Sequence, residues 1–158
     1  MVVNQPRLGP SLRRAWVGYQ RRIDDAMTAA GFGDRGFPDG RVLRMCRDDP
    51  DITSAAIARE LGMSRQGAGK IVNALRDRGF VTLAPSEQSG REKKITLTPR
   101  AHDYLAAQRQ AARAVEHQLR RRVGAEGFDA LARLVDELGA DDPPRLREYL
   151  RQKSVREL

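Results

Sequence analysis

"ITSAAIARELGMSRQGAGKIVNALRDRGFVTL", residues 52–83, is the stretch of sequence that decides the fold. Thr53 is a plausible N-cap for a first short helix, which carries apolar residues at helical spacing and stops at Gly62. Ser64 can cap a second helix, which ends at Gly79. Two short helices joined by so brief a turn predict a helix-turn-helix.

Part of this stretch, "SRQGAGK" at 64–70, looks like a phosphate-binding loop, but its spacing excludes one. A Walker loop follows a strand and needs G-x-x-x-x-G-K-[ST]. Ser64 stands where the first glycine should be, and Ile71 stands where serine or threonine is required. No strand-like segment precedes the stretch. The sequence therefore argues against a nucleotide-dependent enzyme.

Residues 64–78 have two different faces when they are placed on a helix at about 100° per residue. Ala68, Ile71 and Leu75 share the apolar face, with Val72 at its edge. The opposite face carries Gln66, Gly69, Lys70, Asn73 and Arg76, with Arg65 at its edge. Such side chains supply the donors and acceptors that contact base edges and phosphates in a DNA major groove. A merely solvated helix face is the alternative.

Two glycines inside this helix need a reason, since each costs about 1 kcal/mol relative to alanine. Gly67 lies toward the packed side, where it could let the two short helices cross closely. Gly69 lies on the polar face, where it could let the backbone approach DNA.

The hydrophobic period changes to two after Gly79, which indicates a β-hairpin. "FVTLA" at 80–84 and "KKITLT" at 93–98 are short strand-like runs, and in the second Ile95 and Leu97 alternate with polar residues. The polar loop "PSEQSGRE" lies between the two runs.

Helical spacing of apolar residues predicts further helices on both sides of this core. One helix covers 11–30, and a short one within 40–50 stops before Pro50. A long helix begins at Pro99, which suits a first turn, and a last amphipathic helix stops at Gly139.

This order predicts a mainly α protein of the α+β winged helix-turn-helix class, with about six helices and a β-hairpin wing. We expect a flexible N-terminal arm, one winged-helix domain and a basic C-terminal tail or short helix. The expected boundaries are 1–10 for the arm, 11–140 for the domain, about 38–98 for its DNA-binding lobe, about 11–30 and 99–139 for its dimerisation helices, and 141–158 for the tail.

The flanking helices carry more apolar side chains than one small core needs, which favours a homodimer. A two-fold protein also matches a palindromic DNA site. Packing of these side chains within one subunit is the alternative. The expected interface residues are Leu12, Trp16, Tyr19, Leu105, Leu119, Leu131 and Val135.

The 158-residue chain has about the length of one domain and carries a net charge of +8, with a pI near 10.5. That excess favours a polyanionic partner, most simply nucleic acid. The N-terminal sequence lacks the apolar region of a secretory signal, and no apolar run approaches the ~20 residues of a membrane span. One cysteine excludes an internal disulfide. We expect a cytoplasmic protein without membrane contact.

The ordered combination of these pieces resembles the MarR (multiple-antibiotic-resistance regulator) family of bacterial winged-helix transcription factors. The matching residues are the stretch 52–83 and "SGREKKITLT" at 89–98. They follow the family pattern of a Thr-capped helix, L-G-x-S, a recognition helix, L-x-x-x-G-[FLY]-[VI] and a wing with D-x-R-x-x-x-[VIL]-x-L-T. The resemblance covers residues 11–140.

The resemblance implies a homodimer built from the first and last helices and bound to double-stranded DNA, with recognition helices in major grooves and wings at the minor groove. By match, Arg91 is the wing arginine and a candidate for minor-groove insertion. Lys93 and Lys94 would contact phosphates or face solvent. Ser89 replaces the family's wing aspartate, which orients the arginine in much of the family. The candidate DNA-binding residues are Thr53, Ser54, Ser64, Arg65, Gln66, Gly69, Lys70, Asn73, Arg76, Arg91 and Lys93.

Many members of the family bind small aromatic acids, and Arg13, Trp16 and Tyr19 are candidate residues for such a pocket. Packing in the dimer core is the alternative for these side chains. No sequence pattern identifies the effector.

Other chemistry is not indicated. Cys46 continues an apolar spacing and is expected to be a buried structural residue. His102 and His117 are too far apart on one helix to share a metal ion. We expect no metal, cofactor or catalytic residue, and interpret the protein as a regulator, most simply a repressor. A winged-helix protein-interaction module without specific DNA binding is the first alternative. An enzyme whose catalytic pocket carries no recognisable sequence motif is the second.

Overall fold

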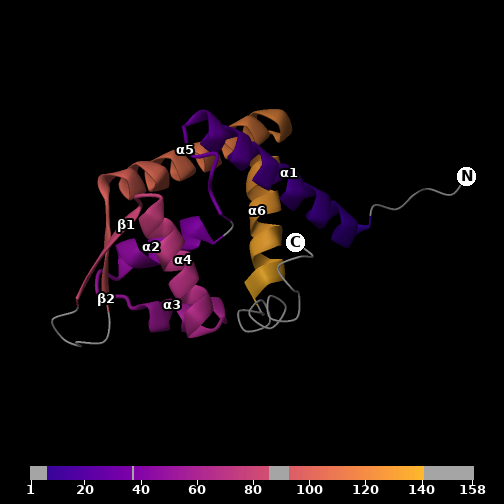
Figure 1. Ribbon diagram of the computed structural model, residues 1–158. Coiled ribbons are helices and arrows are strands. Elements are labelled where there is room, and N and C mark those ends of the chain that lie inside the picture. Colours follow the sequence, from indigo (N-terminus) through magenta and orange to yellow (C-terminus); the bar gives the residue numbers. More distant parts are fainter. Residues whose placement is uncertain (1–6, 37, 86–92, 141–158) are drawn as a thin grey trace, which may run out of the picture.

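The computed structural model describes residues 7–36, 38–85 and 93–140. Its elements, shown in Figure 1, are α1 (Leu8–Ala29), α2 (Asp39–Asp48), α3 (Ser54–Leu61), α4 (Arg65–Asp77), β1 (Val81–Pro85), β2 (Lys93–Leu97), α5 (Pro99–Val123) and α6 (Ala125–Ala140). The predicted winged helix-turn-helix class is confirmed. Within the described ranges, no helix is both long and apolar enough to cross a membrane.

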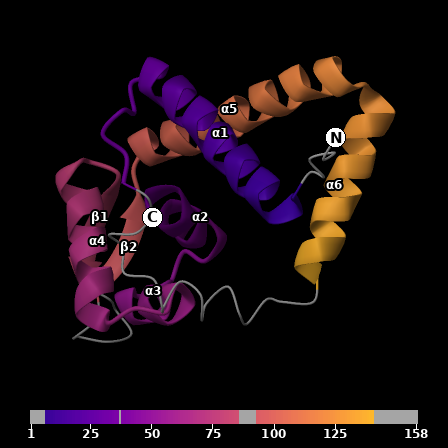
Figure 2. The same cartoon turned by 90° about the vertical axis from the view of Figure 1, so that its right-hand side faces the viewer.

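Helices α1 and α5 cross above a lobe made of α2, α3, α4 and the hairpin (Figure 1). Helix α6 turns back from the end of α5. A view from the side places α6 across the molecule from α4 and the hairpin (Figure 2). The helix-turn-helix and the helices expected to form the dimer therefore occupy different sides of the subunit.

Local signals fix the turn between α3 and α4, as the sequence predicted. The amide of Ala56 donates to Thr53 Oγ1 at 3.2 Å, and the amide of Gly67 donates to Ser64 Oγ at 3.1 Å. Gly62 ends α3 in the left-handed conformation, with φ of 65°. Glycine adopts this conformation without the steric cost of a Cβ.

Helix α1 starts earlier than expected, because Leu8, Gly9 and Pro10 belong to its first turn and not to a flexible arm. Proline is tolerated there, since the first amides of a helix have no acceptor within it. The rest of the expected arm, residues 1–6, and the expected tail at 141–158 lie outside the described residues.

The two strands pair antiparallel, with Leu83 opposite Ile95. Ile95 is buried, whereas Lys94 and Thr96 are exposed, so the predicted alternation of β2 is confirmed. Pro99 begins α5 after Thr98, whose hydroxyl donates to the carbonyl of Gly79 at 2.7 Å.

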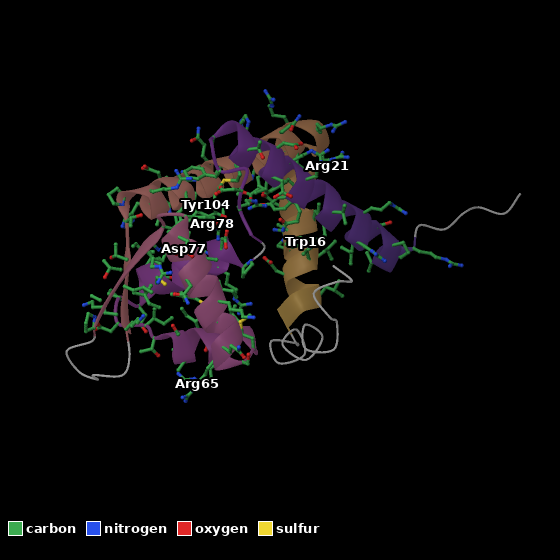
Figure 3. The ribbon with its side chains drawn as sticks, viewed as in Figure 1. Trp16, Arg21, Arg65, Asp77, Arg78 and Tyr104 are labelled. Carbon is green, nitrogen blue, oxygen red and sulfur yellow. The ribbon has the colours of Figure 1, made fainter. Side chains whose placement is uncertain are left out.

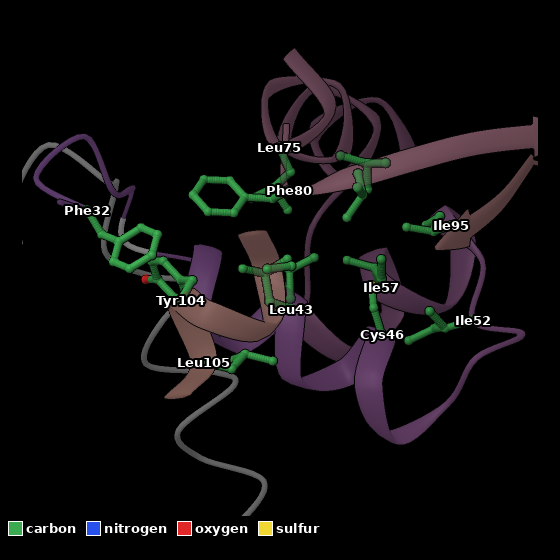
Figure 4. Close-up of a cluster of buried hydrophobic side chains, with 14 of the residues drawn as sticks. Phe32, Leu43, Cys46, Ile52, Ile57, Leu75, Phe80, Ile95, Tyr104 and Leu105 are labelled. Carbon is green, nitrogen blue, oxygen red and sulfur yellow. The ribbon is translucent and has the colours of Figure 1, made fainter. Parts of the chain in front are cut away.

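One hydrophobic core joins the lobe to the crossing of α1 and α5 (Figure 4). Phe32, Phe80 and Tyr104 form its aromatic end. Tyr104 meets the two phenylalanine rings edge-on, with centroid distances of 5.3 Å and 5.4 Å. Because Tyr104 belongs to α5 and Phe80 follows α4, this cluster packs the end of α4 against α5.

One predicted position is wrong, and the apolar face of α4 differs from the predicted one only in the order of burial of two residues. Leu105, expected at the dimer interface, is 2% exposed in the single chain and belongs to its core, because α5 packs there against α1 and α2. In α4, Val72 is buried and Ile71 is only half-buried. The apolar face of α4 is therefore turned slightly from the predicted one, toward Val72.

Candidate nucleic-acid interface

Helix α4 presents one continuous polar face to solvent, opposite the face that packs into the core. The exposed side chains along it are Arg65, Gln66, Lys70, Asn73 and Arg76. Arg65 lies at the end of α4 farthest from α5 (Figure 3). A Cβ added at Gly69 would have no neighbouring atom within 4 Å, so the backbone of α4 is accessible there. This geometry fits a major groove, in which side chains and backbone both approach the bases.

The hydroxyls of Thr53 and Ser64 each accept an amide hydrogen bond at the start of a helix. Each hydroxyl keeps its own O–H as a donor. Ser54, the first residue of α3, is half-buried. Two helix N-termini with free amide donors and a positive dipole end suit phosphate groups. The positions of Thr53, Ser54 and Ser64 are thus compatible with their predicted role of binding DNA phosphates.

Arg76 forms an ion pair with the next residue, Asp77. Its Nε and Nη2 donate to Asp77 Oδ1 at 3.0 Å and 2.7 Å, and both side chains are exposed. Exposed pairs of this kind contribute ~0–1 kcal/mol, so a phosphate can replace the carboxylate.

Of the two wing lysines, Lys94 lies 3.4 Å from the Asp51 carboxylate, whereas Lys93 is exposed at the start of β2. The pair with Asp51 connects the hairpin to the segment before α3. Arg91, the predicted wing arginine, and Ser89 lie outside the described residues.

The interpretation of Gly67 as a close crossing point of the two short helices is wrong. A Cβ at this position would lie 3.3 Å from Ser64 Oγ and 3.6 Å from Met63 Sδ, both in the turn. Gly67 therefore leaves room for the cap and for Met63, because the first turn of α4 faces its own preceding residues and not α3.

Large apolar side chains are exposed on the helices expected to form the dimer. Leu134 and Leu138 are 66% and 60% exposed, and none of the side chains at 125–139 is buried. Apart from Met63, the exposed large apolar residues of the described chain are Leu8, Trp16, Val17, Leu119, Val123, Leu131, Leu134, Val135 and Leu138, on α1, α5 and α6. Exposed apolar surface of this extent marks an interaction site. Leu12 and Tyr19 are half-buried.

The candidate ligand residues share one stretch of α1. Trp16 and Tyr19 are stacked, with ring centroids 6.2 Å apart and 14° between their planes. Arg13 is exposed one turn earlier. Burial, aided by the nearby Glu116 carboxylate, raises the pKa of Tyr19. The stack offers an aromatic surface, with Arg13 one turn before Trp16 on α1 and the Glu116 carboxylate near Tyr19.

Cys46 is buried in α2, as expected, at 4% exposure. Burial, with a smaller contribution from Asp49, raises the pKa of its thiol to about 11. The thiolate that reacts with oxidants and metals is therefore scarce at neutral pH.

Sequence reasoning missed an ion pair between α2 and the end of α4. Arg78 Nη1 and Nη2 donate to Asp39 Oδ2 and Oδ1 at 2.6 Å and 3.0 Å. Among the described residues, Asp39 is the only charged side chain that is buried. The sequence offered no signal for this contact, because both residues look like ordinary charged helix ends.

Comparison with known proteins places this arrangement among transcription regulators. Residues 34–92, which include α2, the helix-turn-helix and the first strand of the hairpin, match the model of the MarR family. The chain is similar to the HTH-type transcriptional repressor Rv2887 of Mycobacterium tuberculosis, with 27% identity over 134 residues, 85% of this chain and 94% of that protein.

Crystal structures of Rv2887 have a similar fold. The structure in complex with salicylic acid has a TM-score of 0.61 and 25% identity, and the match covers 87% of this chain and 100% of that one. The structure in complex with DNA has a TM-score of 0.64 and 24% identity, with coverage of 85% and 99%.

Proposed function

We propose that the chain is a transcriptional repressor of the MarR family that binds a roughly palindromic operator in double-stranded DNA as a homodimer. The observation that carries the proposal is the exposed polar face of α4, which follows a capped helix-turn-helix. Occupancy of the operator would block transcription. The protein acts in the cytoplasm as a regulator and not as an enzyme.

The contacts divide by chemistry. Gln66 and Asn73 on α4 pair with base edges, for which their amide groups supply both a donor and an acceptor. Arg65 and Lys70 bind phosphates or guanine, and the helix starts at Thr53 and Ser64 hold further phosphates. Lys93 and the wing arginine inferred from the family pattern complete the interface at the minor groove.

The dimer forms through α1, the end of α5 and α6. Their exposed leucines and Trp16 would be covered by the same surface of a second copy, as a two-fold interface requires. The two recognition helices then face successive major grooves, one helical turn of DNA apart.

A small aromatic acid is the class of effector that fits. Salicylic acid is bound to Rv2887 in its crystal structure, and here Trp16 and Tyr19 offer stacked rings on the same helix as the Arg13 cation. A ligand that prefers one arrangement of the dimer would change the spacing of the two recognition helices and release the operator.

The test begins with selection of duplexes from a random-sequence library by the full-length protein. Binding of the enriched operator is then measured across a salt series for Lys70→Ala, Asn73→Ala and a matched control, Arg109→Ala, which removes an exposed charge from α5. Lys70→Ala removes one phosphate contact from each protomer, so the salt slope of the dimer should fall by about 2. Asn73→Ala should relax base preference at one position of each half-site, and Arg109→Ala should change neither the salt slope nor the base preference.

Weak, sequence-blind binding that disappears with salt would contradict the proposal. The net charge alone would then explain DNA attraction, and a protein-interaction module would be the better description.

A further inference from the structure

Arg78 ends the recognition helix with its guanidinium turned inward. In Figure 3 it lies at the end of α4 that faces α5, away from Arg65. Its Nε donates to the carbonyl of Ala74 at 3.2 Å, and Nη1 donates to the carbonyl of Asp34 at 3.0 Å. With the two bonds to Asp39, every nitrogen of the guanidinium is engaged inside the protein. The guanidinium of Arg78 is therefore occupied in holding the fold around α4.

The burial of Asp39 means that its carboxylate depends on the Arg78 guanidinium as a hydrogen-bond partner. The carboxylate is 2% exposed and also accepts a hydrogen bond from the amide of Gly36 at 2.5 Å. A buried carboxylate needs such partners, because the removal of one of them leaves an unpaired charge shielded from water, which is energetically unfavourable. A planar guanidinium can satisfy both oxygens at once, whereas an ammonium group cannot.

The segment between α1 and α2 extends the contact toward the dimerisation helices. Asp34 and Gly36, which bond to Arg78 and Asp39, flank Arg35, and Arg35 forms an ion pair with Asp24 of α1. The ring of Phe80 lies beneath Arg78, with 5.5 Å from the guanidinium carbon to the ring centroid. Polar contacts thus run from α1 through the loop to the end of α4, beside the aromatic cluster that includes Tyr104 of α5.

We propose that Arg78 is a positioning residue, which with Asp39 fixes the angle of α4 to the dimerisation helices and so sets the half-site spacing that the dimer accepts. The inference rests on the proposed function and goes beyond it, since it assigns spacing selectivity to a residue remote from DNA. A residue that only stabilised the lobe would change the amount of active protein but not the ranking of operators.

The experiment compares full-length wild type with Arg78→Lys and Asp39→Asn, and with Arg109→Lys as a matched control on exposed α5. The probes are the operator selected by the wild type and versions with one or two base pairs inserted or removed between its half-sites. One inserted base pair rotates one half-site by about 35° relative to the other. Active concentrations are determined by titration, so that misfolded protein does not enter the ratios.

For Arg78→Lys and Asp39→Asn, we expect a loss of about tenfold in affinity for the native spacing, with a much smaller loss, about threefold or less, for at least one altered spacing. Arg109→Lys should keep the wild-type profile. If one variant fails to fold, the other still decides the question, since each breaks the same contact from a different side.

An unchanged ranking of spacings in both variants would overturn the inference and leave Asp39–Arg78 as a stabilising pair, with the proposed function intact. If the wild type enriches no sequence at all, the proposed function fails and the spacing role fails with it. The two failures are therefore distinguished by the wild type alone.

Discussion

Gln108 of α5 occupies the space that a side chain at Gly40 of α2 would need. A Cβ at position 40 would lie 2.5 Å from Gln108 Nε2 and 2.8 Å from Oε1. Arg44 holds the amide in place, because its Nη1 donates to Gln108 Oε1 at 2.7 Å. Ala101, Leu105, Ala112 and Val115 form an apolar stripe on α5, in which Gln108 is the polar exception. The helix crossing at Gly40 explains this exception.

The first prediction is that substitutions at these two positions are not additive. Gly40→Ala should displace the amide and cost about 1 kcal/mol for the lost hydrogen bond, offset in part by the better helix propensity of alanine. In Gln108→Ala, the same change at Gly40 finds room and should be neutral or stabilising. Urea unfolding of the two single variants and the double variant measures the coupling. Purely additive free energies would contradict the contact.

The second prediction separates the two effects of Gly69. Since a Cβ there meets no atom within 4 Å, Gly69→Ala should raise the free energy of unfolding, by up to about 1 kcal/mol. If the backbone of α4 approaches DNA at this point, the added methyl group should also weaken operator binding severalfold. Thermal unfolding and operator titration are measured on the same sample. Stabilised protein with wild-type affinity would exclude the close approach.

The third prediction concerns the hydroxyl of Thr53. Thr53→Ala removes the acceptor for the Ala56 amide and should cost about 1 kcal/mol of stability. Thr53→Ser keeps an oxygen at this place and should recover most of the loss. If the hydroxyl also donates to a phosphate, operator affinity, calculated from the concentration of folded protein, should fall in Thr53→Ala. Thr53→Ser should restore it. Equal affinity in all three proteins would remove Thr53 from the interface.

Local chemistry explains which parts of this fold could be predicted from the sequence. Thr53 and Ser64 cap helices, and Gly62 ends one, through contacts with residues only a few positions away in the sequence. The helix-turn-helix could therefore be located almost to the residue. The start of α1 was misplaced because Gly9 and Pro10 suggest a loop, although a first helical turn tolerates both residues.

Contacts between distant segments gave no such signal. Asp39 and Arg78 are 39 residues apart, and each resembles a common charged helix end until the fold brings them together. Leu105 is a second residue whose surroundings the sequence did not predict. Periodicity indicates the apolar face of α5 but not whether the same subunit or a second copy covers it, and here α1 and α2 of the same chain do so.

The fourth prediction tests which surface joins two copies. Leu134 and Leu138 are among the most exposed apolar side chains of α6, and neither contributes to the core of the single chain. Leu134→Glu with Leu138→Glu should shift the protein from dimer to monomer in sedimentation velocity, because burial of the two carboxylates would be unfavourable. Gln110→Glu, on exposed α5, is the control for added charge. A dimer unaffected by the double variant would place the interface elsewhere.

The fifth prediction follows from the pKa of Cys46, which burial raises from the ordinary 9.0 to about 11. The folded protein then keeps its thiol proton in a range where the unfolded chain loses it. This contribution to stability is intact below pH 9 and is lost as the pH rises from 9 toward 11, by about 2–3 kcal/mol at most.

Other groups also titrate in this range, so the informative quantity is the difference between wild type and Cys46→Ala. Alanine removes the thiol and leaves a small cavity, which should lower stability by a similar amount at every pH. The stability advantage of the wild type over Cys46→Ala, from urea unfolding between pH 8 and 10.5, should therefore shrink as the pH rises. Two parallel curves would show that the folded and unfolded chains hold this proton equally well, and that α2 does not shield the thiol from water.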